Sequence, residues 1–236
     1  MSSQTSHRLF LRLPLARRSS RSLFVARLAW RWHVCRYASV KRAIDIAVAG
    51  IALVMLAPLL AFVACCVWLE DRGPVLFWQY RVGRHGREFR FPKIRSMVVD
   101  AERRLADIAD LNEHGAAGVT FKQLRDPRIT RVGRLIRRAS IDELPQLWCV
   151  LTGDMTLVGP RPPLPREVAR YAPDDRLRLS VTPGLTCIWQ VSGRARIPFP
   201  EQVSMDLEYI RERSIALDLK LLCRTVPAVI RGQGAY

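Results

Sequence analysis

The sequence predicts an α+β fold that is mostly helical, in which a membrane segment precedes a cytoplasmic domain. Three observations support this prediction: an uncharged apolar run of 24 residues, two strand-like segments around a short turn, and apolar stripes at helical spacing near the C-terminus. The chain has 236 residues, of which 49% are hydrophobic and 25% charged. A chain of this length and composition can bury a sizeable core, which excludes a wholly disordered protein.

The net charge of the chain is strongly basic. Lys and Arg number 38 against 21 Asp and Glu, which gives +17 at pH 7. Such a surplus indicates an anionic partner, which composition alone leaves open as nucleic acid, a phosphate-rich substrate or an anionic membrane leaflet.

Residues 1–42 form a basic N-terminal extension that contains ten Lys or Arg and no acid. Apolar residues recur there at helical spacing from Leu23 to Tyr37, which predicts a basic amphipathic helix lying on an anionic membrane. For residues 1–20 an unstructured arginine-rich extension is an equally open interpretation.

Cysteine and histidine usage argues against metal and disulfide chemistry. The six cysteines show no CxxC spacing, and the four histidines are scattered along the chain. We therefore expect buried thiols in a reducing compartment rather than a disulfide framework or a transition-metal site.

The uncharged apolar run extends from Ile46 to Leu69. A straight helix of that length measures about 36 Å, more than the roughly 30 Å that the hydrocarbon core of a bilayer requires. Pro58 lies in the middle of the run and removes a helix hydrogen bond, so we expect a kink or break between two arms of about 17 Å each. Residues 43–70 are thus predicted to form a membrane helix-break-helix.

Basic residues lie on both sides of the apolar run. Lys41 and Arg42 precede it, and seven Lys or Arg follow between residues 72 and 95. Because positive flanks favour the cytoplasmic side, both ends of the run are expected there. This symmetry favours a re-entrant helix that enters one leaflet and returns, with a proline-kinked spanning helix as the alternative. Residues 71–236 then form the cytoplasmic domain.

The cytoplasmic domain is predicted to begin with a β-hairpin. Residues 75–83 and 87–97 flank the turn Arg84-His85-Gly86 and are rich in aromatic and β-branched residues, and Pro92 places the second strand at a sheet edge. Amphipathic helices are expected to follow, some of them resting on the bilayer surface. Their apolar stripes are Val98, Ala101, Leu105, Ile108 and Leu111, then Val203, Leu207 and Ile210, and finally Ile215, Leu219, Leu222, Val226 and Ile230.

The segment 126–163 concentrates the residues that can carry chemistry. Five arginines, at 128, 131, 134, 137 and 138, precede the adjacent carboxylates Asp142 and Glu143. This combination indicates a site for a multiply charged anion and a divalent cation. The alternative is a helix capping box from Ser140 to Glu143, but Pro145 would then remove a hydrogen-bond donor inside the helix. A helix start nearer to Pro145 would release both acids into the preceding turn.

An aspartate at this position can act as a nucleophile. With an ordinary pKa of about 3.9 it is ionised at pH 7 and can attack a phosphorus atom without a general base. Adjacent side chains on a helix point about 100° apart, so Asp142 and Glu143 can take separate roles, one as nucleophile and the other in holding a metal ion.

Two further segments contain candidate binding residues. Four prolines surround Arg161 in residues 158–165 and hold its backbone stiff, although a rigid linker has the same composition. Residues 183–194 combine turn formers with Trp189, Gln190 and Arg194, which can stack on a base and bind phosphate; an ordinary turn and strand is the alternative.

Taken in order, six motifs resemble those of the bacterial sugar transferases known as monotopic phosphoglycosyl transferases. These are KRAID, the proline-split apolar run, YRVGRHGREFRFPKIRSM, DPRITRVGRLIRRASIDELPQLW, GDMTLVGPRP and PGLTCIWQVSGR. The resemblance covers roughly residues 41–236. Six motifs in the same order are far more specific than any single short match.

The resemblance implies a membrane enzyme on the cytoplasmic face of the bacterial inner membrane, with a re-entrant helix broken at Pro58. Such enzymes move a sugar 1-phosphate from a UDP-sugar to polyprenyl (undecaprenyl) phosphate, release UMP and start a lipid-linked glycan. Asp142 matches the family's nucleophile, which forms an aspartyl phosphosugar intermediate. Glu143 matches its partner, and together they are the candidate ligands for Mg²⁺. The predicted substrate-binding residues are Lys93, Arg95, Arg137, Arg138, Pro160, Arg161, Pro162, Gln190 and Arg194.

The predicted partners are therefore a UDP-sugar, polyprenyl phosphate and anionic membrane lipids, not nucleic acid. Two other hypotheses remain at this stage, a basic nucleic-acid-binding protein and a catalytically silent membrane adaptor. Three residues depart from the family pattern, Ala57, Cys149 and Cys187, and none of them belongs to the Asp-Glu pair. The sugar, the glycan pathway and the oligomeric state do not follow from the sequence.

Overall fold

The computed structural model describes residues 20–101, 103–104 and 126–231, with the backbone alone for residues 20–36, 195, 230 and 231. The chain divides into two units, Met1–Val40 and Lys41–Tyr236. In the first unit the described residues form the beginning of the long helix α1. Residues 1–19 of the predicted basic extension lie outside the described part of the chain.

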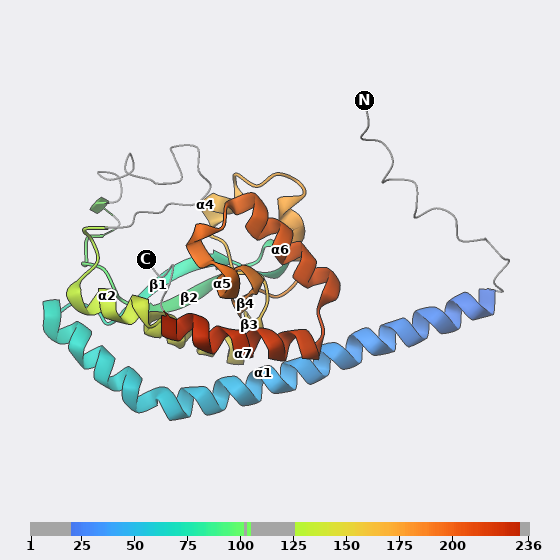
Figure 1. Ribbon diagram of the computed structural model, residues 1–236, viewed down its shortest axis with the longest axis horizontal. Coiled ribbons are helices and arrows are strands. Elements are labelled where there is room, and N and C mark those ends of the chain that lie inside the picture. The colour runs from blue at the N-terminus through green and yellow to red at the C-terminus, as the bar shows by residue number, and fades with distance from the viewer. Residues whose placement is uncertain (1–19, 102, 105–125, 232–236) are drawn as a thin grey trace. The chain divides into compact units, whose positions relative to one another are not determined.

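Helix α1 runs from Ser20 to Asp71 without interruption, and Pro58 lies inside it. The sequence predicted a kink or break at Pro58, and the structure has one helix that bends in its second half, drawn in light blue to cyan (Figure 1). A proline removes one hydrogen bond and clashes with the carbonyl four residues earlier, and a bend accommodates both while the helix continues on either side. Within the described residues one helical stretch, Tyr37–Asp71, is long and apolar enough to cross a membrane, and its most apolar 18 residues have a mean hydropathy of 2.7.

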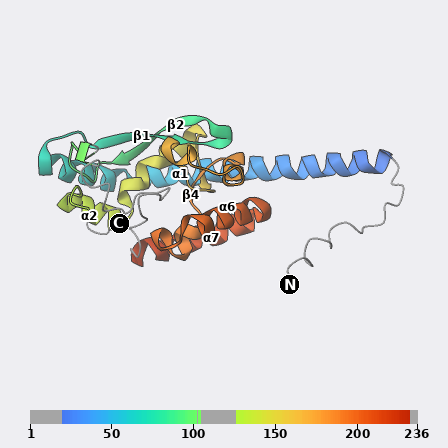
Figure 2. The same cartoon turned by 90° about the horizontal axis from the view of Figure 1, so that it is seen from above.

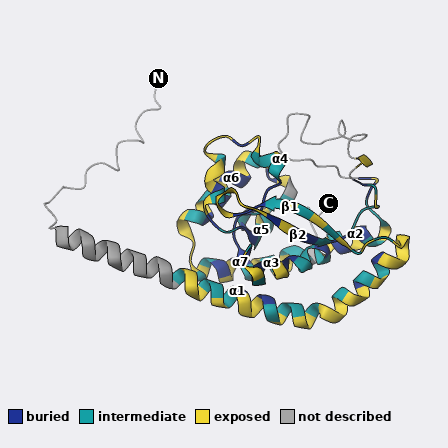
Figure 3. Cartoon of the chain, turned by 180° about the vertical axis from the view of Figure 1, so that it is seen from behind, coloured by how far each residue is buried: buried dark blue, intermediate teal, exposed yellow. Residues whose placement is uncertain are grey.

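Large apolar side chains are exposed in the middle of this stretch. Val54 and Met55 are 76% and 73% exposed, and Phe62 is 68% exposed. Figure 3 shows the exposed residues following the outside of α1. A surface of this kind is unfavourable in water and is typical of contact with lipid.

The predicted hairpin is confirmed. Strand β1 (Leu76–Val82) pairs antiparallel with β2 (Glu88–Ile94), in a register that runs from Leu76 opposite Ile94 to Val82 opposite Glu88. The connection is the single turn η1 (Arg84–Gly86), in which His85 and Gly86 have positive φ angles of 58° and 82°. Alternation along β2 turns Phe89 and Phe91 into the core.

Short helices and single turns make up most of the remaining chain, and two of the predicted amphipathic helices are confirmed as α6 and α7. Of the first predicted stripe, Val98 and Ala101 lie in a turn region, and Leu105, Ile108 and Leu111 lie outside the described residues. Figures 1 and 2 show the arrangement of these elements. In chain order they are α2 (Arg131–Arg138), η3 (Ile141–Gln146), α3 (Leu147–Thr152), β3 (Thr156–Val158), α4 (Pro165–Val168), η4 (Asp175–Ser180), β4 (Gly184–Thr186), α5 (Ile188–Ser192), η5 (Arg194–Arg196), α6 (Phe199–Glu212) and α7 (Ile215–Arg231).

Both arms of the apolar part of α1 pack on these elements. The main core takes Ala49 from α1 and joins it to β2, α3, β3, α6 and α7. A second cluster joins Val63 and Val67 of α1 to Ile94 of β2 and Ile136 of α2. The buried residues of the main core are Ala49, Phe89, Phe91, Leu147, Cys149, Val150, Met155, Leu157, Val158, Tyr209 and Leu221.

Candidate active site

Asp142 and Glu143 lie on the single 3-10 turn η3 between α2 and α3. Ser140 precedes the turn with a positive φ of 55°, and its side chain makes no capping hydrogen bond, so the capping-box interpretation is wrong. Helix α3 begins only at Leu147, after Pro145, as the alternative helix start predicted. The reason is local: a proline is tolerated where its nitrogen needs no helix acceptor, and the two acids are then left on the preceding turn.

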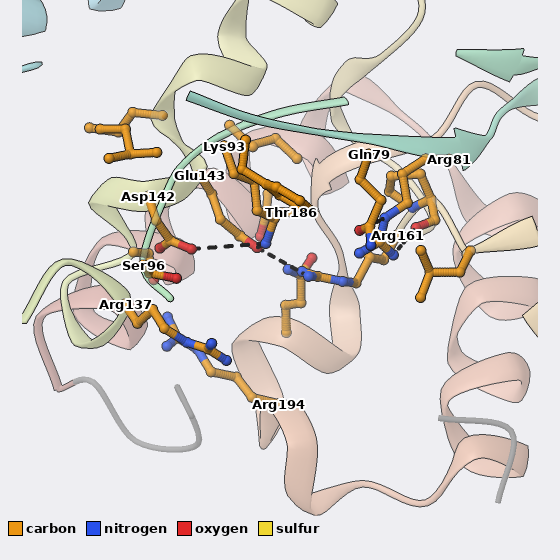
Figure 4. A pocket seen from close by; sticks show the side chains of 18 of the residues that line it. Gln79, Arg81, Lys93, Ser96, Arg137, Asp142, Glu143, Arg161, Thr186 and Arg194 are labelled. Atoms are coloured by element: carbon orange, nitrogen blue, oxygen red, sulfur yellow. Dashed lines mark hydrogen bonds and ion pairs between the residues drawn. The ribbon is translucent and has the colours of Figure 1, made fainter. Parts of the chain in front are cut away.

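A lysine and an arginine from two other elements meet this acid pair. Lys93 of β2 donates to Glu143 Oε1 at 2.9 Å, and its Nζ lies 3.9 Å from Asp142 Oδ2. Arg161, in the segment after β3, donates from Nη2 to the same Glu143 oxygen at 3.1 Å. Figure 4 shows these side chains converging from separate elements. The geometry therefore assembles one site from residues 50 positions apart in the sequence.

The two acids differ in their electrostatic environment. Burial raises the pKa of Asp142, and the nearby Lys93 opposes this effect. Burial also raises the pKa of Glu143, but Lys93 and Arg161 together outweigh it and hold that pKa well below its usual range. Glu143 is thus a firmly ionised carboxylate. Asp142 is a desolvated carboxyl group whose ionisation depends on its cationic neighbours. The ordinary pKa of an aspartate did not predict this dependence.

The acid pair opens into a cavity of about 720 Å³. Most of the predicted binding residues line it, although they come from the hairpin, the helix α2, the segment after β3 and the α5–η5 region. Those in the lining are Lys93, Arg95, Arg137, Asp142, Glu143, Arg161, Pro162, Gln190 and Arg194. A cavity with a few charged groups among apolar walls is the usual form of a small-molecule site.

Two predicted binding residues lie elsewhere, and a third is already paired. Arg138 is exposed at the end of α2 and Pro160 does not line the cavity. Helix periodicity turns Arg137 and its neighbour Arg138 about 100° apart, which explains why one reaches the cavity and the other does not. Arg95 is 7% exposed and forms an ion pair with Asp71, the last residue of α1. The ion pair with Asp71 therefore ties Arg95 to the end of α1, which is a role in the fold.

The backbone around Arg161 is held by close packing against β4. Gly159 N donates to Thr186 O at 3.0 Å, and Gly184 N donates to Pro160 O at 2.8 Å. A Cβ on Gly184 would lie 2.0 Å from Gly159 N, so only glycine permits this approach. The role of Pro160 is thus to offer a carbonyl to this backbone contact, and the stiffness predicted for the proline-rich segment supports the Arg161 side chain.

Arg81 is a cavity residue that the sequence reasoning missed. Its Nη1 donates to Pro162 O at 3.1 Å and its Nε to Gln79 Oε1 at 3.1 Å. Burial, with the charge of Arg161, lowers the pKa of Arg81 to about 10. The hairpin register contains the signal, because Gln79 and Arg81 oppose Phe91 and Phe89 and so share the inward face with Lys93.

The α5–η5 region provides a further part of the cavity lining. Cys187 donates through Sγ to Gln190 Oε1 at 3.1 Å, and burial lowers the pKa of the Arg194 guanidinium. In Figure 4 Arg194 and Arg137 lie on the Asp142 side, and Arg81 lies beyond Arg161. Trp189 is 8% exposed and packs with Cys187 and Ile197, and it also lines the cavity; base stacking by its ring stays a prediction.

Converging cations around an acid pair are an arrangement suited to phosphate groups, and the same chain carries one long apolar helix among its described residues. The chain belongs to the bacterial sugar transferase family, whose sequence model matches residues 36–232.

Three curated relatives show the range of the family. The galactosyl transferase CpsE of Streptococcus agalactiae is 46% identical over 81% of this chain and 41% of its own length. The undecaprenyl-phosphate galactose phosphotransferase of Salmonella typhimurium is 40% identical over 84% of this chain and 42% of its own length. The exopolysaccharide production protein ExoY of Sinorhizobium fredii is 35% identical over 83% of this chain and 88% of its own length. The chain thus spans about two fifths of the first two relatives and most of the third.

Proposed function

We propose that this chain transfers a sugar 1-phosphate from a UDP-sugar to membrane polyprenyl phosphate and releases UMP. The observation that supports this most strongly is the Asp142-Glu143 pair, which meets Lys93 and Arg161 at a cavity lined by further arginines. Relatives named undecaprenyl-phosphate galactose phosphotransferase and undecaprenyl-phosphate glucose phosphotransferase support the substrate class. The reaction would initiate a lipid-linked glycan, such as an exopolysaccharide, O-antigen or glycoconjugate.

In the first half of the proposed reaction an oxygen of the Asp142 carboxylate attacks the sugar-bearing phosphorus of the UDP-sugar. The Asp142–phosphorus bond forms, the bond from that phosphorus to the bridging oxygen breaks, and UMP leaves with the electron pair. Phosphoryl transfer depends mainly on positioning and charge neutralisation, which Lys93, Arg161 and Arg137 can provide. Partial desolvation of Asp142, which raises its pKa, also removes the water that would otherwise shield its oxygen.

In the second half the phosphate oxygen of polyprenyl phosphate attacks the phosphorus held on Asp142. The new oxygen–phosphorus bond forms as the Asp142–phosphorus bond breaks, which regenerates the carboxylate and leaves a polyprenyl diphosphate sugar. A covalent intermediate lets one cavity serve a soluble donor and a membrane-bound acceptor in turn.

Asp142 and Glu143 also fit a Mg²⁺ ion shared with substrate phosphates. No group of three or more His, Cys, Asp or Glu side chains in the described residues is arranged as a metal cage. Mg²⁺ commonly binds through one or two carboxylates and completes its shell with phosphates and water. Lys93 and Arg161 both contact Glu143 through Oε1, which leaves its other oxygen without a basic partner among the described residues. When bound, the ion would neutralise charge on the diphosphate.

We further propose that the apolar part of α1 is re-entrant rather than spanning. Near one end, Lys41 binds Asp218 and Arg42 binds the carbonyls of α3. At the other end Glu70 accepts from Arg131 N at 2.8 Å. A helix that crossed a bilayer would separate its ends by roughly 30 Å on opposite faces, whereas here both ends contact one unit.

This topology would place the catalytic domain on the cytoplasmic face of the bacterial inner membrane. The basic residues at both flanks of the apolar run favour that side, and an anionic leaflet would attract them. The exposed apolar residues around the bend would then enter the leaflet.

The test is UMP release from UDP-galactose or UDP-glucose with polyprenyl phosphate and Mg²⁺. We expect release by the full chain, and loss of at least 1,000-fold of the activity in Asp142→Asn, about 4 kcal/mol of transition-state stabilisation. Asp174→Asn is the matched control, because Asp174 is exposed and caps no helix through its side chain. Full activity in Asp142→Asn would exclude the proposed nucleophile. A sugar phosphate trapped on Asp142 would exclude a silent adaptor.

A further inference from the structure

The start of the apolar stretch contacts three different elements of the catalytic unit within little more than one helical turn. Arg42 donates to the carbonyls of Val150 and Leu151 at the end of α3. Lys41 binds Asp218 of α7 at 2.7 Å. Asp45 accepts from the Thr156 hydroxyl and from Leu157 N of β3, the latter at 3.2 Å. Lys41, Arg42 and Asp45 lie within little more than one turn of α1. They therefore hold α7, α3 and β3 together.

Tyr209 of α6 joins the same network through β3 and α7. Its hydroxyl lies 2.7 Å from Val158 O and 2.8 Å from Asp218 Oδ1. The ring is 3% exposed, and Asp45 and Asp218 are 4% and 6% exposed. Polar groups buried so completely are costly unless each is bonded, so this network has one favourable arrangement.

The network holds both halves of the candidate active site. Arg42 contacts α3, which directly follows the η3 turn that carries Asp142 and Glu143. Tyr209 and Asp45 contact β3, which leads within three residues of Val158 to Arg161. Arg161 in turn binds Glu143 at 3.1 Å. The distance between these two side chains is thus fixed partly by groups that touch neither of them.

We propose that Lys41, Asp45, Thr156, Tyr209 and Asp218 form a positioning network for Arg161. It sets the β3 segment relative to the acid pair and ties that arrangement to the start of the membrane helix. This inference rests on the function proposed above, and it assigns to Tyr209 and Thr156 a role in catalysis without contact to the substrate.

Two substitutions remove single hydroxyl groups from the network with little change in volume. Tyr209→Phe removes both contacts of the phenol, and Thr156→Val removes the bond to Asp45. Tyr80→Phe is the control for the first, because Tyr80 is 59% exposed on β1. Thr156→Ser is the control for the second, because it keeps the hydroxyl.

The first measurement is kcat and KM for UMP release, per folded protein, with UDP-galactose and UDP-glucose. A misplacement of about 1 Å can cost 100-fold in rate, so we expect kcat to fall at least tenfold in both variants with KM changed less than threefold. Both controls should retain wild-type kcat. Wild-type kcat per folded protein in Tyr209→Phe and Thr156→Val would overturn the proposal, because a purely structural role lowers only the folded fraction.

The second measurement is amide hydrogen exchange at Gly159 and Gly184, whose N–H groups hold the backbone around Arg161. We expect exchange there at least tenfold faster in the two variants than in the controls. Unchanged exchange would overturn the proposal whether or not the protein is active. If the wild type releases no UMP, the proposed function fails. The amide exchange of Gly159 and Gly184 in the two variants still decides whether the network positions β3.

Discussion

Replacing Lys93 by Met tests how the ionisation of Asp142 is controlled. Methionine is similar in length but uncharged, and Lys93→Arg is the matched control that keeps the charge. Lys93 Nζ lies 3.9 Å from Asp142 Oδ2. With an effective dielectric constant of about 20, a charge at this distance stabilises the carboxylate by about 4 kcal/mol. That free energy corresponds to about three pKa units.

The sign of the expected effect follows from the charges. Burial already raises the pKa of Asp142, and Lys93 is the strongest opposing influence. Removing this cation raises the pKa further, so a larger share of Asp142 is protonated at neutral pH and unable to attack phosphorus. Activity needs ionised Asp142. We therefore expect the activity of Lys93→Met to fall off at a higher pH than that of the wild type.

The assay is the pH dependence of kcat/KM for UMP release between about pH 5 and 10. We expect the acidic limb of Lys93→Met to move upward by one to three units, so that rates at a pH below the wild-type limb fall about ten- to thousandfold. Lys93→Arg should keep the limb within about one unit of the wild type. A uniform loss at every pH, with the limb unmoved, would refute the electrostatic reasoning and leave Lys93 a role in binding only.

Three further predictions concern the cavity, the backbone and the membrane. Arg81→Gln should raise KM for the UDP-sugar about tenfold or more, the effect of losing a charged hydrogen bond, and the exposed Arg87→Gln should not. Gly184→Ala should lower Tm by several degrees, because its Cβ would lie 2.0 Å from a backbone nitrogen; an unchanged Tm would contradict the close packing. In a cysteine-free background, Ala38→Cys and Arg72→Cys should both react with an impermeant maleimide only after the cytoplasmic face is opened; labelling of one alone from outside would show a spanning helix.

The parts of the fold that depend on local pattern were predictable from sequence. The hairpin follows from alternation around a turn, and α6 and α7 follow from apolar stripes at helical spacing. The course of α1 at Pro58 was left open by the sequence, which predicted either a kink or a break. A proline removes one bond whether a helix bends or breaks, and the outcome depends on tertiary contacts, here those of Ala49 and Val67 with the catalytic unit.

The residues of the candidate site also divide into those that the local sequence pattern indicates and those that depend on tertiary packing. Sequence reasoning found Asp142, Glu143 and Arg161, because acids and arginines in one segment indicate phosphate chemistry. It missed Arg81, because only the pairing of β1 with β2 shows that this arginine shares a face with Lys93. It also overestimated Arg138, whose neighbour Arg137 takes the inward position. Which member of an arginine pair faces a cavity depends on the rotation of the helix, and packing determines that rotation.

The charge of the cavity provides a reason why one site would serve the two anionic substrates of the proposed reaction in turn. Lys93, Arg81, Arg137, Arg161 and Arg194 line it, and Glu143 is the acid that binds Lys93 and Arg161 most closely. The cations that line the cavity outnumber the acids, so the protein alone does not neutralise them. Burial of the guanidinium groups lowers the pKa of Arg81, Arg137 and Arg194. In the proposed reaction the departure of UMP takes negative charge out of the cavity while Asp142 is covalently occupied. The same cations then face less negative charge, since the phosphate held on Asp142 keeps only one, and the lipid phosphate that adds more is also the group that completes the reaction.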